Sequence, residues 1–148
     1  PKWGRLFFFF FPAVILVIII SSFINNISTG IEVTKTWIIW NGSLSALGVL
    51  LGRGHILTIL TAFIVAPLSS LNPALAAGWF AGLAEAYLKK PQVKDFQKLS
   101  QGISIKEIYT NKVTHILLIV ILANLGSVIG TAVGGASVIR TFLEFFSF

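Results

Sequence analysis

Long apolar stretches separated by short polar segments run through most of the chain. Three of them, residues 6–24, 34–52 and 113–133, are 19 to 21 residues long. A helix needs ~20 apolar residues to cross the ~30 Å hydrocarbon core of a bilayer. Pro12 falls in the second turn of the first stretch, where a missing N–H is less costly than at mid-helix. The pattern therefore predicts three membrane-spanning helices.

Two further apolar stretches in the middle of the chain, 56–71 and 74–88, are shorter. At ~1.5 Å per residue each gives roughly 23 Å of helix, which is short for a full crossing. Two arrangements fit: a pair of short tilted spans, or a re-entrant helical hairpin that turns at 69–73. Irregular backbone at membrane depth needs protein or a water-filled cavity around it. We predict an all-α, polytopic transmembrane helical bundle of about five membrane segments, in which the middle pair either spans or re-enters.

The polar segments set the predicted orientation. The loop 89–112 has six lysines, at positions 89, 90, 94, 98, 106 and 112, against two carboxylates. The positive-inside rule places this loop, and the N-terminus with Lys2 and Arg5, in the cytoplasm. Counting crossings then gives a multi-pass cell-membrane protein with an external C-terminus. The tail 137–148 mixes charged and aromatic residues and predicts an interfacial helix.

Composition supports a bilayer setting. The chain is 55% hydrophobic and 11% charged, whereas a soluble domain has roughly 25% charged residues. We expect residues 1–148 to form a single integral membrane domain whose partner is the lipid bilayer. The net charge of +6 is explained by topology, so it does not indicate a nucleic-acid partner. The absence of cysteine excludes disulfides and thiolate metal sites, and the absence of methionine leads us to expect further residues before Pro1.

Small residues recur every four positions on two of the predicted helices. The first ridge is Ala74, Gly78, Gly82 and Ala86, and the second is Gly126, Gly130 and Gly134. Such ridges let helix backbones approach closely in lipid, where burying apolar surface gives no net drive. We expect both ridges to serve mainly for packing within the chain. Contacts between copies in a homo-oligomer are the second interpretation.

Glu85 is the one carboxylate expected near a membrane edge. An ionisable group within a membrane segment suggests proton or ligand handling. The simpler interpretation is a structural pair with Lys89, four residues later, or with Arg53. Arg53 is predicted on the same side of the membrane, so we predict an Arg53–Glu85 contact. His55 lies beside Arg53 at the entrance of the third helix and can titrate near neutral pH.

Asn72 and Pro73 precede the fourth helix. Together with Ala74 they match the three-residue signature of aquaporins, but only one copy is present. The simpler interpretation is that Asn72 caps the helix and Pro73 occupies its first turn. With Arg53, His55 and Glu85, these two residues mark the region where a ligand path would lie. We expect no metal site and no cofactor in this chain, because its sequence contains no recognisable catalytic or metal-binding constellation.

The stretch GRGHILTILTAFIVAPLSSLNPALAAGWFAGLAEAYLKKPQVKDF resembles the membrane region of the TraB/PrgY-like (pheromone-shutdown) family, in an archaeal-type form. The later segment ISIKEIYTNKVTHILLIVILAN, followed by LGSVIGT, is similar to the same family's link into its last helix. The resemblance extends from about Leu50 to Thr131. Ile56 departs from it, since a proline is expected after the histidine, and this puts the start of that helix in doubt.

The resemblance implies a membrane domain that follows an N-terminal soluble domain. In this family that domain is related to Tiki-type and erythromycin-esterase-like folds and is regarded as a metal-dependent peptidase, and bacterial members limit the activity of peptide pheromones. Its catalytic residues and metal have no counterparts here. The leading hypothesis is therefore a membrane domain that anchors or regulates a peptidase or hydrolase domain absent from this chain. A small channel or transporter using the broken helix region is the rival hypothesis, and a purely structural subunit of a membrane complex is the third.

Overall fold

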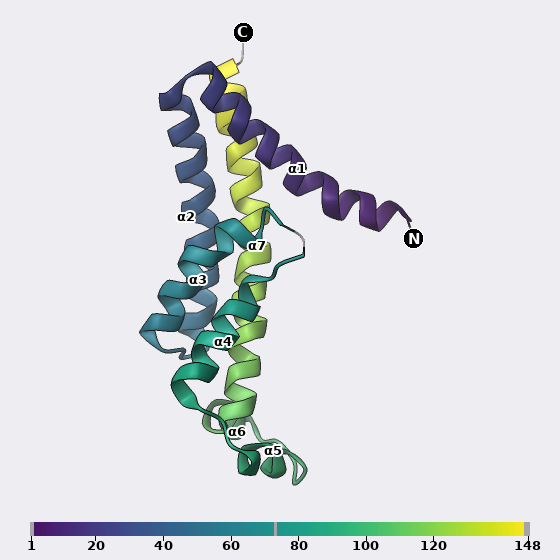
Figure 1. The fold of residues 1–148 in the computed structure, drawn as a ribbon, viewed down its shortest axis with the longest axis vertical. Coiled ribbons are helices and arrows are strands. Elements are labelled where there is room, and N and C mark those ends of the chain that lie inside the picture. The colour runs from purple at the N-terminus through teal and green to yellow at the C-terminus, as the bar shows by residue number, and fades with distance from the viewer. Residues whose placement is uncertain (1, 73, 147–148) are drawn as a thin grey trace.

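A computed structural model describes residues 2–72 and 74–146, and these residues form helices and connecting turns (Figure 1). The predicted all-α class is confirmed for them. The helices in chain order are α1 (Lys2–Asn25), α2 (Ile27–Leu51), α3 (Ile56–Ser69), α4 (Ala77–Lys89), α5 (Val93–Leu99), α6 (Ile105–Thr110) and α7 (Lys112–Phe146). Within the described residues, α1 and α7 are long and apolar enough to cross a bilayer, and α3 is a shorter apolar helix.

The centre of the fold is an antiparallel pair formed by α2 and α7, which run side by side along the long axis (Figure 1). Glycines make this contact close. Gly126 faces the carbonyl of Leu44, and Gly130 faces the backbone of Asn41. From the other side of the interface, Gly48 of α2 faces the carbonyl of Leu122. The ridge predicted on the last helix therefore lies against α2, backbone against backbone.

Helices α3 and α4 form a hairpin that covers the lower part of this pair. Figure 1 shows α3 rising from the lower end of α2 and α4 descending again, with their turn near mid-height of α7. Helix α3 packs on α2, and α4 packs on α7. The indole N–H of Trp37 donates to the carbonyl of Pro67 at 3.0 Å and ties α2 to α3. Gly78 and Gly82 of α4 both face Val120 of α7.

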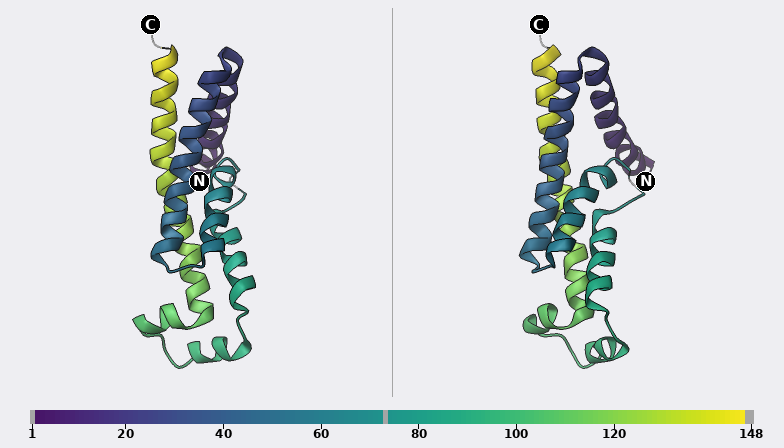
Figure 2. Two further views of the ribbon diagram at one scale, coloured as in Figure 1. Left: turned by 90° about the vertical axis from the view of Figure 1, so that its left-hand side faces the viewer. Right: turned by 60° about the vertical axis from the view of Figure 1, so that its left-hand side comes forward.

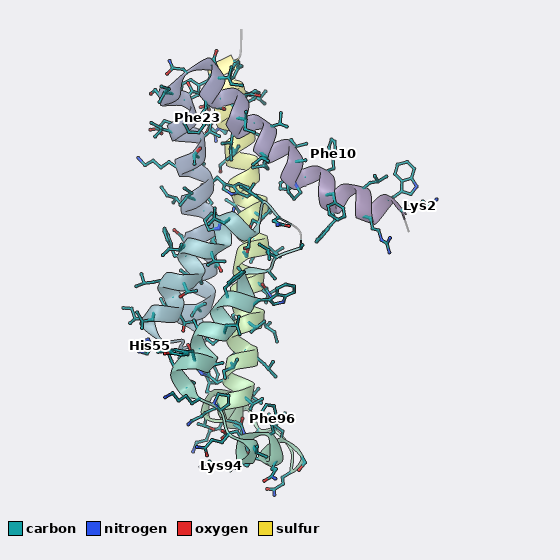
Figure 3. All side chains as sticks on the ribbon, viewed as in Figure 1. Lys2, Phe10, Phe23, His55, Lys94 and Phe96 are labelled. Carbon is teal, nitrogen blue, oxygen red and sulfur yellow. The ribbon has the colours of Figure 1, made fainter. Side chains whose placement is uncertain are left out.

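Helix α1 leaves the upper end of α2 and slants away from the bundle. Both views of Figure 2 place its N-terminus near the level of the α3–α4 turn. Its C-terminal half contacts the bundle through Ile15, which is fully buried, and through the ring of Phe23, which lies on Gly30. The predicted loop 89–112 contains α5 and α6 and lies at the lower end, where Figure 3 labels Lys94 and Phe96.

Two predicted helix boundaries differ in the structure. The second helix was expected to begin at residue 34, but α2 begins at Ile27, because Asn26 caps it by accepting from the N–H of Ser28. The tail 137–148 was expected as a separate interfacial helix, but α7 continues unbroken to Phe146. Gly134 and Gly135 do not break the helix, because Trp40 and Phe11 pack against them. The last two residues of the predicted tail lie outside the described part.

The fourth helix begins at Ala77, three residues later than predicted. Its cap position is Ala76, which makes no side-chain capping bond. Asn72 does not cap the helix, because its Oδ1 accepts from the N–H of Ala74 at 3.0 Å. Ala74 is consequently exposed and outside the helix, so the predicted ridge is reduced to Gly78, Gly82 and Ala86. Pro73 lies outside the described residues.

The glycine contact between α2 and α7 can be tested by adding one methyl group. In Gly126→Ala the new Cβ would collide with the carbonyl oxygen of Leu44 and lie 2.8 Å from the Cα of Ser45. Overpacking of this kind costs about 1–3 kcal/mol. We expect a clearly lower thermal unfolding temperature for the purified protein in detergent.

Gly4→Ala is the matched control. A Cβ at Gly4 meets nothing within 4 Å, so this change should leave the unfolding temperature unchanged or slightly raised, because alanine favours helix more than glycine does. Equal unfolding temperatures for the two variants would contradict close backbone packing at Gly126.

Candidate functional site

Glu85 lies at the centre of a polar cluster where the ends of several helices meet. Its side chain is 1% exposed although it is ionisable. One carboxylate oxygen, Oε2, accepts from the hydroxyl of Thr58 at 2.6 Å and from the backbone N–H of His55 at 3.1 Å. Both donors belong to the start of α3, whose first N–H groups have no partner within the helix. The buried carboxylate thus satisfies the entrance of the neighbouring helix.

Two basic groups face the other oxygen of Glu85. The Nζ of Lys89 lies 3.6 Å from Oε1, and the Nδ1 of His115 lies 3.7 Å from it. Lys89 also contacts Nδ1 of His115. The Nε2 of His115 lies 2.6 Å from the carbonyl oxygen of Gly52, which can only accept, so we assign the proton to Nε2. With a neutral ring, Nδ1 accepts from Lys89, and the cluster balances one carboxylate with one ammonium.

Arg53 does not take the place predicted for it. Among the described residues, Glu85 forms an ion pair with Lys89 and lies 3.7 Å from the ring of His115, and the expected Arg53–Glu85 ion pair is not formed. The reason is the turn before α3, where Arg53 adopts a left-handed backbone with a φ of 59°. Its guanidinium instead lies 5.1 Å above the ring of Tyr109 in α6.

His55 contributes to the cluster through its backbone and caps α3 with its side chain. Its Nδ1 accepts from the N–H of Leu57 at 3.1 Å. Thr58 and His115 also belong to this site, although the sequence did not place them there. The sequence gives a weak indication for Thr58, because this residue lies in the first turn of the helix that follows His55. His115 is 30 residues from Glu85 in sequence, so only the packing of α4 on α7 brings the two together.

A second polar cluster, without charges, surrounds the α3–α4 turn. The Oδ1 of Asn41 accepts from the hydroxyl of Ser70 at 2.6 Å and from that of Thr131 at 3.1 Å. Because the proton of Ser70 is used in this way, the Ser70–Ser127 contact of 3.1 Å has Ser127 as its donor. Helices α2 and α7 and the turn after α3 are therefore linked at mid-height of the molecule.

Asn124 of α7 completes the contact with α4. Its Oδ1 accepts from the N–H of Gly78 at 2.8 Å. Gly78 is the second residue of α4, whose N–H needs an outside acceptor. A residue of another helix therefore makes the bond that a local cap would make. Asn72 is exposed on the turn and takes no part in this network.

The charged cluster does not resemble a metal centre. Within residues 2–72 and 74–146 no three His, Cys, Asp or Glu side chains come close enough together to hold a metal ion. Lys89 occupies the side of Glu85 where a cation would bind. The arrangement fixes the positions of three helix ends and holds a proton-bearing histidine beside a carboxylate.

Comparisons with known proteins give one family. A family model described as "TraB family protein, C-terminal domain" matches residues 3–143. An uncharacterized protein of Methanocaldococcus jannaschii is 41% identical over 109 residues, which cover 72% of this chain and 28% of that protein. The matched segment is thus less than a third of the relative's length. No solved structure matches the chain.

Removing the charge of Glu85 tests whether the cluster holds the fold together. Glu85→Gln keeps the size of the side chain but leaves Lys89 without its carboxylate and the start of α3 with a weaker acceptor. Breaking a buried ion pair costs about 3–5 kcal/mol. We expect a large drop in the thermal unfolding temperature in detergent.

Glu144→Gln serves as the control, because it removes the carboxylate of an exposed i,i+4 pair with Arg140. Exposed pairs contribute about 0–1 kcal/mol, so the unfolding temperature should barely change. If Glu85→Gln were as stable as Glu144→Gln, the cluster would have no structural role and its function would lie in proton or ligand handling.

Proposed function

This chain belongs to the TraB family as its C-terminal domain, and from that premise we propose that it is a multi-pass membrane domain that anchors a hydrolase-type domain carried elsewhere in the full protein. The observation that carries the proposal is the distribution of side chains. Large apolar residues point outward, as in Leu68, Leu83 and Val128, which are 66–68% exposed. Polar ones such as Asn41 and Ser45 are fully buried. This arrangement suits a hydrocarbon solvent and not water.

The proposed topology follows the geometry of the helices. We assign α2 and α7, which run side by side along the long axis, to full crossings, and α3 and α4 to a hairpin that re-enters from the lower side. Helix α1 is long and apolar enough for the bilayer, and its N-terminus lies near the level of the hairpin turn. Helix α3 has 14 residues, or about 21 Å at 1.5 Å per residue, and the hairpin turns near mid-height of α7. Asn124 accepts from the N–H of Gly78, and Trp37 donates to the carbonyl of Pro67, so side chains of α7 and α2 supply polar partners that the backbone on either side of the turn requires at membrane depth.

The lower end is proposed to face the cytoplasm. It carries the lysine-rich segment from Lys89 to Lys112, and the positive-inside rule applies to such short loops. At the upper end, the connection between α1 and α2 is followed by one acidic and one basic residue, Glu32 and Lys35, so this connection has no excess of positive charge.

The small fraction of the relative's length that this chain matches supports the anchoring role. The common segment forms 28% of the Methanocaldococcus jannaschii protein, so most of that protein lies outside the membrane domain proposed here. The family resemblance favours a peptidase or hydrolase domain that is linked to the inactivation of peptide signals. Any metal that such a domain needs would be bound there.

A channel or transporter is the alternative, and the α3–α4 hairpin is the observation that favours it. Broken helices meeting polar groups at mid-membrane are typical of transporter binding sites. The polar groups at the turn, however, bond mainly to one another, and Glu85 has ionic partners. Mutual pairing of this kind suits a fixed scaffold better than an ion path.

Single cysteines can test the topology, because the chain has none of its own. Ser28→Cys, Asn72→Cys and Gln101→Cys place a thiol at the upper end, the hairpin turn and the lower end, and all three positions are exposed in the structure. With a membrane-impermeant maleimide on intact and inverted vesicles, Ser28→Cys should react from outside and Gln101→Cys from the cytoplasmic side. Asn72→Cys should be protected from both sides.

Detergent-solubilised protein provides the control, since all three thiols should then react. Reaction of Asn72→Cys from the same side as Ser28→Cys would mean that α3 and α4 cross the membrane as two spans.

Anchoring is tested on the product of the complete native gene. Its intact mass should be well above 16.1 kDa, and the protein should stay in the membrane pellet after extraction with alkaline carbonate. Deletion of the segment corresponding to residues 3–143 should release the remainder into the soluble fraction. A full-length product that is itself extracted by carbonate would rule out the anchoring role.

A further inference from the structure

The connector between α4 and α7 contains the short helix α5, which lies across the long axis of the molecule. Figure 2 shows it at the lower end, running across the direction of α7. Helix α4 ends at Lys89 and α7 begins at Lys112, so the connector joins two helices of the proposed membrane bundle at their lower ends. In the proposed topology α5 therefore lies parallel to the membrane plane at the cytoplasmic edge.

Asp95 fixes the direction in which each side of α5 faces. Its side chain is 6% exposed, and its Oδ2 accepts from the backbone N–H of Gln92 at 2.8 Å, which closes the first turn. The carbonyl of Asp95 accepts from the Nδ2 of Asn111, just before α7, at 2.9 Å. A helix of seven residues is too short to be stable alone. These bonds therefore hold α5 with Asp95 turned toward the protein.

One flank of α5 is apolar and faces away from the protein. Val93 and Phe96 are three residues apart, so they lie on the same side of the helix, and they are 71% and 58% exposed. Figure 3 labels Phe96 above Lys94, on the side of α5 that is nearer to the membrane helices. Ile103 and Ile105, which follow in the chain, are also exposed. Exposed apolar side chains that are grouped in this way mark contact with a partner or a membrane.

The opposite flank of α5 is basic. Lys94 and Lys98 are four residues apart and exposed, and the ion pairs of the described residues include neither of them. The two carboxylates of the connector are used by its own backbone. Asp95 accepts from the start of α5, and Glu107 accepts from the N–H of Ser104 at 3.5 Å at the start of α6. The lysines therefore present positive charge that these carboxylates do not pair.

We propose that α5 is an interfacial helix that binds the anionic lipid surface of the cytoplasmic leaflet. Val93 and Phe96 enter the upper part of the acyl chains, and Lys94 and Lys98 contact phosphate headgroups. Helices with one apolar side and one lysine-bearing side lie in this region of a bilayer, and basic segments next to membrane helices are attracted to negatively charged lipids. Acyl chains and phosphates form adjoining layers there, which matches the two flanks of α5. The proposal rests on the membrane topology proposed above.

Photocrosslinking of the full native-gene product, reconstituted in lipid vesicles, tests this contact. A photoreactive benzoylphenylalanine replaces Phe96, and its lipid adducts are identified by mass spectrometry. Gln101, which is exposed in the turn after α5, receives the same photoreactive residue as a control. In vesicles of phosphatidylglycerol mixed with phosphatidylcholine, position 96 should give roughly ten-fold more lipid adduct, because the apolar side of an interfacial helix is buried among acyl chains.

Lipid composition tests the role of the lysines. In pure phosphatidylcholine the adduct at position 96 should fall by about five-fold or more, since a single lysine near an anionic surface contributes a factor of about five. Lys94→Gln combined with Lys98→Gln should give the same low yield in the mixed vesicles. Lys35→Gln, an exposed change on α2 near the upper end, should leave the yield unchanged.

Equal lipid adducts at positions 96 and 101, or a yield at position 96 that does not depend on phosphatidylglycerol, would overturn the proposal. Crosslinks from position 96 to protein in place of lipid would assign the apolar flank to a protein partner and equally overturn it.

A photoreactive residue in place of Ile121 keeps this proposal distinguishable from the membrane location itself. Ile121 is exposed on α7, and it should give lipid adducts in both kinds of vesicle. Lipid adducts at position 121 without adducts at position 96 would leave the membrane anchor intact and remove only the interfacial helix. An absence of lipid adducts at both positions would contradict the membrane location as well.

Discussion

Close approach of α2 and α7 is the constraint on which the rest of the structure depends. Gly126 and Gly130 let the two backbones touch at Leu44 and Asn41, and the hydroxyl of Ser45 donates across the interface to the carbonyl of Ala123. This contact fixes the register of the two helices. It therefore also fixes the height at which Asn41 and Thr131 can receive the hairpin turn. A one-residue shift would rotate these polar groups away from Ser70.

The same scaffold separates two kinds of polar site. At the lower end, Glu85, Lys89 and His115 form a charged cluster that joins three helix ends. At mid-height the polar groups are amides and hydroxyls without charge. Because ionised groups are far more costly to bury than amides or hydroxyls, this order agrees with a bilayer whose centre is the least polar region.

Sequence alone predicted the helical class and the family, because these depend on local spacing or on a long continuous match, and it offered Lys89 as one of two alternative partners of Glu85. It failed where a distant residue replaced a local one. Asn72 was predicted to cap the fourth helix, but the side chain of Asn124, which is 46 residues from Gly78 in sequence, accepts from the N–H of Gly78 at the start of α4. Arg53 was placed at the correct end of the fold, but its left-handed backbone directs the side chain to Tyr109. Thr58 and His115 could not be assigned, since only the packing of α3, α4 and α7 brings them to Glu85.

The polar partners of the hairpin turn also set an order of biosynthesis. Ser70 and Gly78 are translated well before Asn124, Ser127 and Thr131, which bond to them or to Asn41 from α7. Until α7 emerges, the nascent chain has these donors and acceptors unsatisfied, and burying them in lipid is unfavourable. In the re-entrant topology that we propose, the hairpin would therefore wait near the membrane surface until α7 is made, and insertion of α7 would be the step that commits the whole domain to its final depth.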